Sequence, residues 1–87
     1  MGRTVLIIED EVVLREDLAV VLRRYGFEVS TAEDAPTGIA LARELEPDVV
    51  LTDLVMPGGG AMAVLEALRT QPCTGVFVMT GFGSLDS

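Results

Sequence analysis

One stretch of this chain, from Val49 to Pro57, constrains the fold more than any other. It begins with a short apolar run, Val49 to Leu51, and soon reaches a single carboxylate, Asp53. Such a run predicts a strand buried on both faces, as in a parallel sheet. Pro57 and the three glycines after it predict a loop, because proline lacks a backbone N–H donor and glycine disfavours regular structure. Ligands of open α/β sheets bind beyond the carboxyl ends of the strands, so Asp53 lies at the expected functional edge.

Hydrophobic periodicity predicts that strands and helices alternate along the whole chain. Strands are expected at residues 4–8, 27–31, 48–53 and 76–80, and helices at 12–25, between a cap at Asp34 and Pro47, and at 60–69. The apolar faces of these helices are expected to consist of Leu14, Leu18, Val21, Leu22 and Tyr25, then Ile39, Leu41, Ala42 and Leu45, then Met62, Leu65 and Leu68. The alternation predicts one α/β domain with a parallel sheet and right-handed crossovers.

Composition excludes several classes of function. The 87 residues carry a formal net charge of −8, which argues against nucleic-acid or anionic-membrane binding by this segment. The absence of histidine excludes His-based triads and His-ligated metal sites. The chain starts without a signal peptide or membrane span, and its lone cysteine, Cys73, cannot form an internal disulfide, so a cytoplasmic location is expected.

Polar side chains follow three of the expected strands. Glu9 and Asp10 follow the first, Asp53 the third and Thr80 the fourth, and parallel strands bring these ends to one edge. Clustered carboxylates repel one another unless a cation neutralises them, and Mg²⁺ prefers carboxylates together with water and phosphate oxygens. An aspartate beside Mg²⁺ can attack phosphorus and hold an aspartyl phosphate, to which Thr80 can donate a hydrogen bond. The alternative is a solvated helix start, an aspartate that caps a helix and an ordinary strand threonine.

The chain resembles the receiver domain of two-component response regulators in three strings: VLIIEDE, DVVLTDLVMPGGGAMAVLEAL and VFVMTGFGSLDS, the last similar to activators of the nitrogen-regulation type. The resemblance implies a flavodoxin-like sheet of order 2-1-3-4 flanked by helices. It implies a signalling domain, not an enzyme, whose Asp53 accepts a phosphoryl group from a histidine kinase and which then controls an output domain or partner. It also implies that Asp10 ligates Mg²⁺ directly, Glu9 assists through water, the Val55 backbone carbonyl completes the protein ligands, and Thr80 is the switch hydroxyl.

The chain departs from that family pattern in three places. Gly60 and Ala61 stand where the family expects Asp-Gly, and because alanine tolerates a positive φ poorly, the loop is expected to shift around Gly58 to Gly60. Glu9 replaces the more usual aspartate. The sequence has no lysine and ends after the fourth expected strand, whereas a receiver has a fifth strand, with a lysine at its end, and a fifth helix. Residues 1–87 are therefore expected to form a truncated receiver, as a single domain.

Other interpretations stay open. A pseudo-receiver or assembly module would use the same fold for protein contacts without phosphotransfer, and the missing lysine favours it for this chain. A phosphohydrolase of the haloacid-dehalogenase type needs D-x-D after the first strand and a lysine, and neither is present. Nucleotide binding is disfavoured because the glycine stretches match neither the P-loop nor the dinucleotide pattern.

Truncation also predicts self-association. The fourth strand becomes an edge that carries no charge and no proline, so it lacks the usual protection against edge pairing. The missing fifth helix is expected to leave one face of the sheet uncovered. The 87-residue chain is therefore expected to form a symmetric dimer that buries Val76, Val78 and the sheet face near Leu51.

Overall fold

The computed structural model describes residues 3–56, 58–71 and 74–79, in which strands and helices alternate. The elements are β1 (Thr4–Ile8), α1 (Val12–Arg24), β2 (Glu28–Ala32), α2 (Ala35–Leu45), β3 (Val49–Asp53), α3 (Gly60–Leu68) and β4 (Gly75–Met79). All three strand pairings are parallel, and the sheet order is β2-β1-β3-β4. The expected sheet order is therefore confirmed. The expected extension of the last strand to Thr80 falls outside the described residues.

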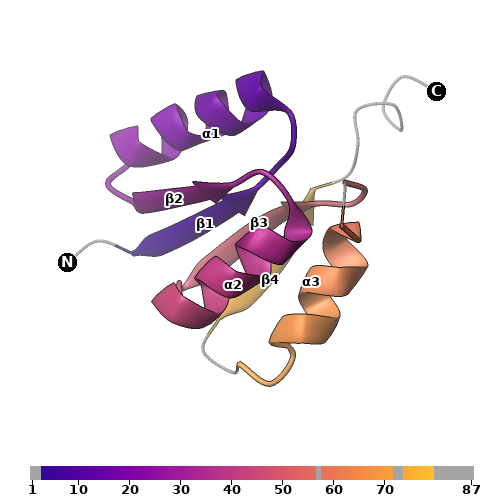
Figure 1. Ribbon diagram of the computed structural model, residues 1–87. Helices are drawn as coiled ribbons and strands as arrows, with labels where there is room; N and C mark the ends of the chain where they lie inside the picture. Colours follow the sequence, from indigo (N-terminus) through magenta and orange to yellow (C-terminus); the bar gives the residue numbers. More distant parts are fainter. Residues whose placement is uncertain (1–2, 57, 72–73, 80–87) are drawn as a thin grey trace.

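Helices cover the sheet on both faces (Figure 1). Val5 and Ile7 of β1 pack with α1, whereas Leu6 and Ile8 pack in the larger core beneath α2 and α3. β1 is thus buried on both faces, whereas the prediction of burial on both faces holds only in part for β3: Val50 and Thr52 are fully buried on one face, and Val49 and Leu51 are half-buried on the other. Leu51 of β3 stays half-buried because α1 lies over β1 and β2.

The inner faces of the helices are built from smaller residues than periodicity predicts. Five side chains expected to face inward are exposed instead: Val21, Tyr25, Leu45, Met62 and Leu65. The buried positions of the three helices are Ala19, then Ala35, Gly38 and Ala42, then Gly60, Ala61, Val64 and Leu68. These small side chains allow close approach, since a Cβ on Gly38 would lie 2.4 Å from Cδ1 of Ile8. Periodicity favours long apolar side chains and so misses an inner face of this kind.

The start of α2 confirms the expected cap. Asp34 accepts the backbone N–H of Thr37 through Oδ1 at 2.8 Å, and Pro36 occupies the first turn, where its missing N–H has no helical partner to lose. Within the described ranges, every helix is too short or too polar to cross a membrane.

β4 lies at the edge of the described sheet. The register pairs Leu51 with Phe77 and Thr52 with Val78, so Phe77 shares the α1 face with Leu51. Phe77 is 60% exposed, whereas Val76 packs against the core on the opposite face. The residues of the expected dimer surface therefore lie on two faces of the sheet, with Val76 and Val78 on the face opposite Leu51 and Phe77, because successive strand residues point to opposite faces.

Candidate metal and phosphoacceptor site

The carboxyl ends of β1 and β3 bring three carboxylates together. Glu9 and Asp10 follow β1, and Asp53 is the last residue of β3, which pairs with β1 in parallel. One carboxylate oxygen from each of the three residues lies within 4.8 Å of the other two. The structure thus gathers Glu9, Asp10 and Asp53 at one edge, as expected from the direction of the strands.

Glu9 is the most deeply buried member of this acidic cluster, with 1% of its surface exposed. Its Oε2 accepts the N–H of Glu11 at 3.1 Å, while Oε1 is buried and has no hydrogen-bond partner in the described part of the chain. Burial raises the pKa of the Glu9 carboxyl, and the negative charge of Asp53 raises it further, against the lowering effect of the Glu11 N–H. A buried carboxylate oxygen in this state is readily stabilised by a cation.

Asp53 is held at the end of β3 by backbone contacts. Its Oδ1 accepts the N–H of Leu54 at 2.8 Å, and the same N–H also donates to the Met79 carbonyl oxygen of β4 at 3.2 Å. The Thr52 hydroxyl donates to the Asp53 carbonyl oxygen at 3.2 Å. These contacts orient the half-buried carboxylate through its Oδ1.

Sequence reasoning missed one basic group at this edge, because it found no basic residue near the carboxylates in the chain. Arg15, in the first turn of α1, donates from Nη1 to the backbone carbonyl oxygen of Glu9 at 2.9 Å. The only indication of this contact in the sequence is that Arg15 lies four residues, or about one helical turn, after Glu11. The guanidinium steadies the backbone at the end of β1. In the described residues, the one ion pair within 4 Å is Arg69 with Glu66, far along the chain.

The loop between β3 and α3 takes up left-handed backbone at its glycines. The φ angles are 90° at Gly58, 126° at Gly59 and 65° at Gly60, values that favour glycine. Ala61 is free of a positive φ and donates its N–H to the Leu54 carbonyl oxygen at 3.2 Å. The resemblance to receiver domains suggested a positive φ at Ala61. The structure instead has the positive φ angles at Gly58, Gly59 and Gly60, where they are favourable.

Two expected site residues are placed less directly. Val55 lies in the loop two residues after Asp53 and is 76% exposed, and its carbonyl oxygen stays a predicted ligand. Thr80 falls outside the described residues. Thr80 directly follows Met79, which is the register partner of Asp53.

The donor set suits Mg²⁺. Carboxylate and carbonyl oxygens are the hard ligands that this ion prefers, and the buried Oε1 of Glu9 lacks a partner among the described groups. Phosphate oxygens and waters usually complete the coordination of Mg²⁺.

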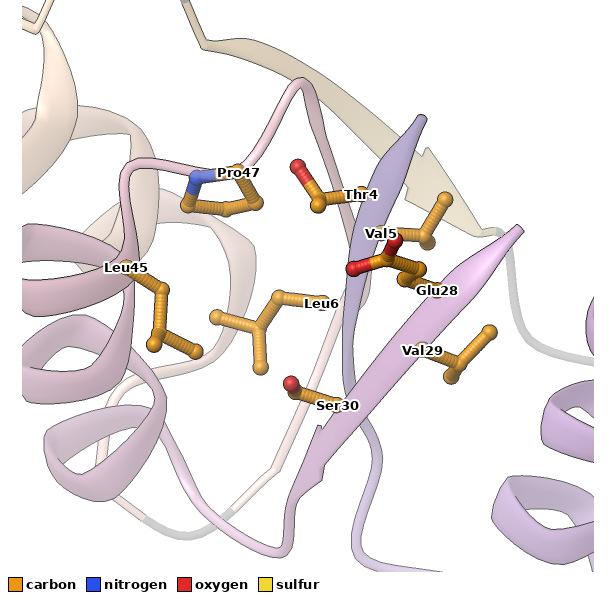
Figure 2. A pocket seen from close by; sticks show the side chains of 8 residues that line it. All are labelled: Thr4, Val5, Leu6, Glu28, Val29, Ser30, Leu45 and Pro47. Carbon is orange, nitrogen blue, oxygen red and sulfur yellow. The ribbon is translucent and has the colours of Figure 1, made fainter. Parts of the chain in front are cut away.

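A separate pocket lies at the opposite end of the sheet (Figure 2). Its volume is about 290 Å³, and the lining residues come from the amino ends of β1 and β2, from the end of α2 and from the connection between α2 and β3: Thr4, Val5, Leu6, Glu28, Val29, Ser30, Leu45 and Pro47. Glu28 is the only charged residue in its described lining. The pocket is therefore distinct from the acidic cluster.

Comparison with known proteins shows which family has this fold and this group of carboxylates. Residues 5–87 match the family model described as the response regulator receiver domain. The chain belongs to this family and is a receiver domain of the two-component response regulators.

Curated relatives include transcriptional regulators. The chain is 39% identical over 79 residues to the transcriptional activator protein PfeR of Pseudomonas aeruginosa, covering 91% of this chain and 26% of that protein. It is 41% identical over 68 residues to the probable transcriptional regulatory protein TcrX of Mycobacterium tuberculosis, covering 78% of this chain and 29% of that protein. The chain thus spans under a third of the length of these two relatives. The expected likeness to the nitrogen-regulation type stays a prediction.

Solved structures agree on the fold. A response regulator receiver domain protein from Clostridium thermocellum superposes with a TM-score of 0.85 at 33% identity, over 97% of this chain and 69% of that one. The chemotaxis protein CheY4 of Vibrio cholerae gives a TM-score of 0.83 at 25% identity, over 99% of this chain and 77% of that one. The flavodoxin-like receiver fold is therefore confirmed.

The raised pKa of Glu9 predicts a pH-dependent stability. A carboxyl whose pKa is higher in the folded state favours folding while protonated, so its contribution is complete below 4.5, the ordinary value, and is lost as the pH rises through the folded pKa. In metal-free buffer, Glu9→Gln should raise the free energy of unfolding at neutral pH by about 1 kcal/mol and remove this part of the pH dependence. Urea unfolding at pH 4.5 and pH 7 checks this. An equal pH dependence in both proteins would contradict it.

Proposed function

We propose that this chain is a phosphoacceptor receiver in which Asp53 takes a phosphoryl group from a histidine kinase. Glu9, Asp10, Asp53 and the Val55 carbonyl hold Mg²⁺, and Thr80 is the hydroxyl that moves toward the phosphoryl group. Phosphorylation changes the conformation of the domain and so controls an output domain or a downstream protein, here in transcription regulation. Residues 1–87 act as one domain, and a cytoplasmic location, expected from the sequence, stays a prediction.

The single observation that carries this proposal is the acidic cluster itself. Three carboxylates meet within 4.8 Å, one of them is 1% exposed, and one of its oxygens has no partner among the described residues. A solvated helix start would leave its carboxylates in water, where neither burial nor an unpaired oxygen arises. A group of this kind is typical of a site that works with a cation bound.

The chemistry follows from the way Asp53 is held. Its Oδ1 accepts the Leu54 N–H, so Oδ2 attacks phosphorus while the bond from phosphorus to the kinase histidine nitrogen breaks, and that nitrogen keeps the electron pair. When bound, Mg²⁺ screens the negative charges of the nucleophile and of the phosphoryl oxygens. Glu9 and Asp10 supply the ligands on the β1 side. The product is an aspartyl phosphate at the end of β3.

A Mg²⁺ titration followed by amide NMR shifts tests the metal site. We expect shifts to concentrate around Asp10 and Asp53 at millimolar-scale Mg²⁺, and Asp10→Asn to weaken binding by about tenfold to a hundredfold. Asp17→Asn is the matched control, because it removes the same charge from an exposed position on α1. Wild-type spectra that do not change near Asp10 and Asp53 would contradict the proposed site.

The second candidate is a pseudo-receiver that uses the fold for protein contacts. The observation that favours it is the absence of lysine from the sequence, since an ammonium group would stabilise the phosphoryl oxygens. Mg²⁺ binding separates the two candidates, because a domain without phosphotransfer has no need of a bound cation.

We also propose that the 87-residue chain self-associates through the α1 face of β3 and β4. Phe77 is 60% exposed beside the half-buried Leu51, at a sheet edge free of charge and proline. Light scattering coupled to gel filtration should give a dimer at tens of micromolar, and Phe77→Ser should shift it toward monomer. A cooperative unfolding transition from a monodisperse wild-type monomer would show that the exposed face is tolerated.

A further inference from the structure

The loop after the phosphoacceptor folds back onto the residue next to it. The Ala61 N–H, in the first turn of α3, donates to the Leu54 carbonyl oxygen at 3.2 Å. The Leu54 N–H in turn donates to Asp53 Oδ1 and to the Met79 carbonyl oxygen. Leu54 is thus held on one side by the sheet and on the other by α3. The carbonyl of the next residue, Val55, takes its position from this arrangement.

Gly60 lies directly against this segment. Its φ of +65° is left-handed, and a Cβ added to it would lie 2.4 Å from the Leu54 carbonyl oxygen and 3.2 Å from both the Leu54 carbonyl carbon and the Val55 Cα. These are backbone atoms, so they cannot move aside as the end of a flexible side chain does. Any side chain at this position must therefore displace the Leu54–Val55 backbone or the start of α3.

The other two loop glycines face different neighbours. A Cβ on Gly58 would meet the ring of Pro36 in α2, and a Cβ on Gly59 would meet the Ala63 methyl group in α3. Both contacts are with side chains outside the segment that follows Asp53. Of the three glycines, Gly60 is the one whose lack of a side chain decides where the backbone of Leu54 and Val55 lies.

We infer that Gly60 is a positioning residue, which sets the Val55 carbonyl oxygen at the distance from the acidic cluster that Mg²⁺ binding requires. This inference rests on the proposed function, because it assumes that the Val55 carbonyl is a metal ligand. Gly60 touches neither the metal nor the phosphoryl group in this role. It acts through the Leu54–Val55 backbone, and a side chain there separates the carbonyl ligand from the three carboxylates.

The test compares Mg²⁺ affinities, read from amide NMR shifts, in variants of the 87-residue chain. Gly60→Ala should weaken Mg²⁺ binding by about tenfold to a hundredfold, as loss of a supporting contact around a metal site does. Gly60→Asn should do the same, although asparagine accepts a left-handed φ and so relieves most of the backbone strain. Gly26→Ala is the matched control: Gly26 has a φ of +93°, nothing lies within 4 Å of an added Cβ, and it is at the end of α1.

The outcomes separate this inference from the proposed function. Weaker Mg²⁺ binding in both Gly60 variants, with wild-type affinity in Gly26→Ala, supports it. Wild-type affinity in a folded Gly60→Ala overturns it and leaves the proposed function intact, as does equal weakening by Gly26→Ala. If both Gly60 variants lose their folded amide spectra, Gly60 is a folding residue and the inference is wrong. Failure of the wild-type chain to bind Mg²⁺ removes the proposed function and the inference together.

Discussion

Asp53→Asn is expected to abolish phosphate uptake. Asparagine keeps the shape of the side chain and can still accept the Leu54 N–H, but it lacks the carboxylate oxygen that attacks phosphorus. The protein that carries this chain, with any sequence that follows it, is incubated with Mg²⁺ and a small phosphodonor and measured as intact mass. The wild type should gain one phosphate, and Asp53→Asn should gain none. In the 87-residue chain alone we expect slow or undetectable uptake, because it has no lysine to stabilise the phosphoryl oxygens.

Asp17→Asn serves as the control for this loss. It removes one negative charge from an exposed position of α1, away from the acidic cluster, and should take up phosphate as the wild type does. The same phosphate adduct on wild type and Asp53→Asn would place the acceptor elsewhere and contradict the assignment.

Gly38→Val should destabilise the fold by about 3 kcal/mol, a large share of the stability of a small domain. Helix propensity alone predicts the opposite sign, because glycine is the poorer helix former. The reason is space: a Cβ at this position in α2 would lie 2.4 Å and 2.6 Å from two side-chain carbons of Ile8, which is fully buried. Urea unfolding followed by circular dichroism measures the change.

The matched control is Ala40→Val, two residues further along α2 at an exposed position. It introduces the same β-branched side chain and should cost about 0.5 kcal/mol through helix propensity alone. A Gly38→Val protein as stable as Ala40→Val would show that α2 can move away from β1, and that the close contact is unimportant.

Much of the fold could be predicted from the sequence because it depends on local patterns. The apolar runs and the helical periodicity located every described strand and helix to within two residues at each end, and alternation implied a parallel sheet. The acidic cluster could be predicted for the same reason. Glu9, Asp10 and Asp53 follow strands that run in the same direction, so the backbone alone brings them together.

The remaining features depend on packing between distant segments. The burial of Ala19 and Gly38, in place of larger neighbours, follows from how closely the helices approach the sheet. The contact of Arg15 with the Glu9 carbonyl depends on the direction in which α1 leaves β1, which the sequence does not reveal. A side chain at Gly60 would clash with the Leu54 carbonyl, which lies six residues earlier in the chain. The sequence alone indicated only a glycine-rich loop.

The site of phosphorylation tests the central claim most directly. An aspartyl phosphate is an acyl phosphate, which borohydride reduces to the alcohol, so a phosphorylated aspartate becomes homoserine. The phosphodonor-treated protein is reduced, digested and sequenced by tandem mass spectrometry. We predict homoserine at position 53, dependent on Mg²⁺ during the incubation. Homoserine at Asp10 or at another aspartate, with Asp53 unchanged in protein that has taken up phosphate, would contradict the role of Asp53 as the phosphoacceptor.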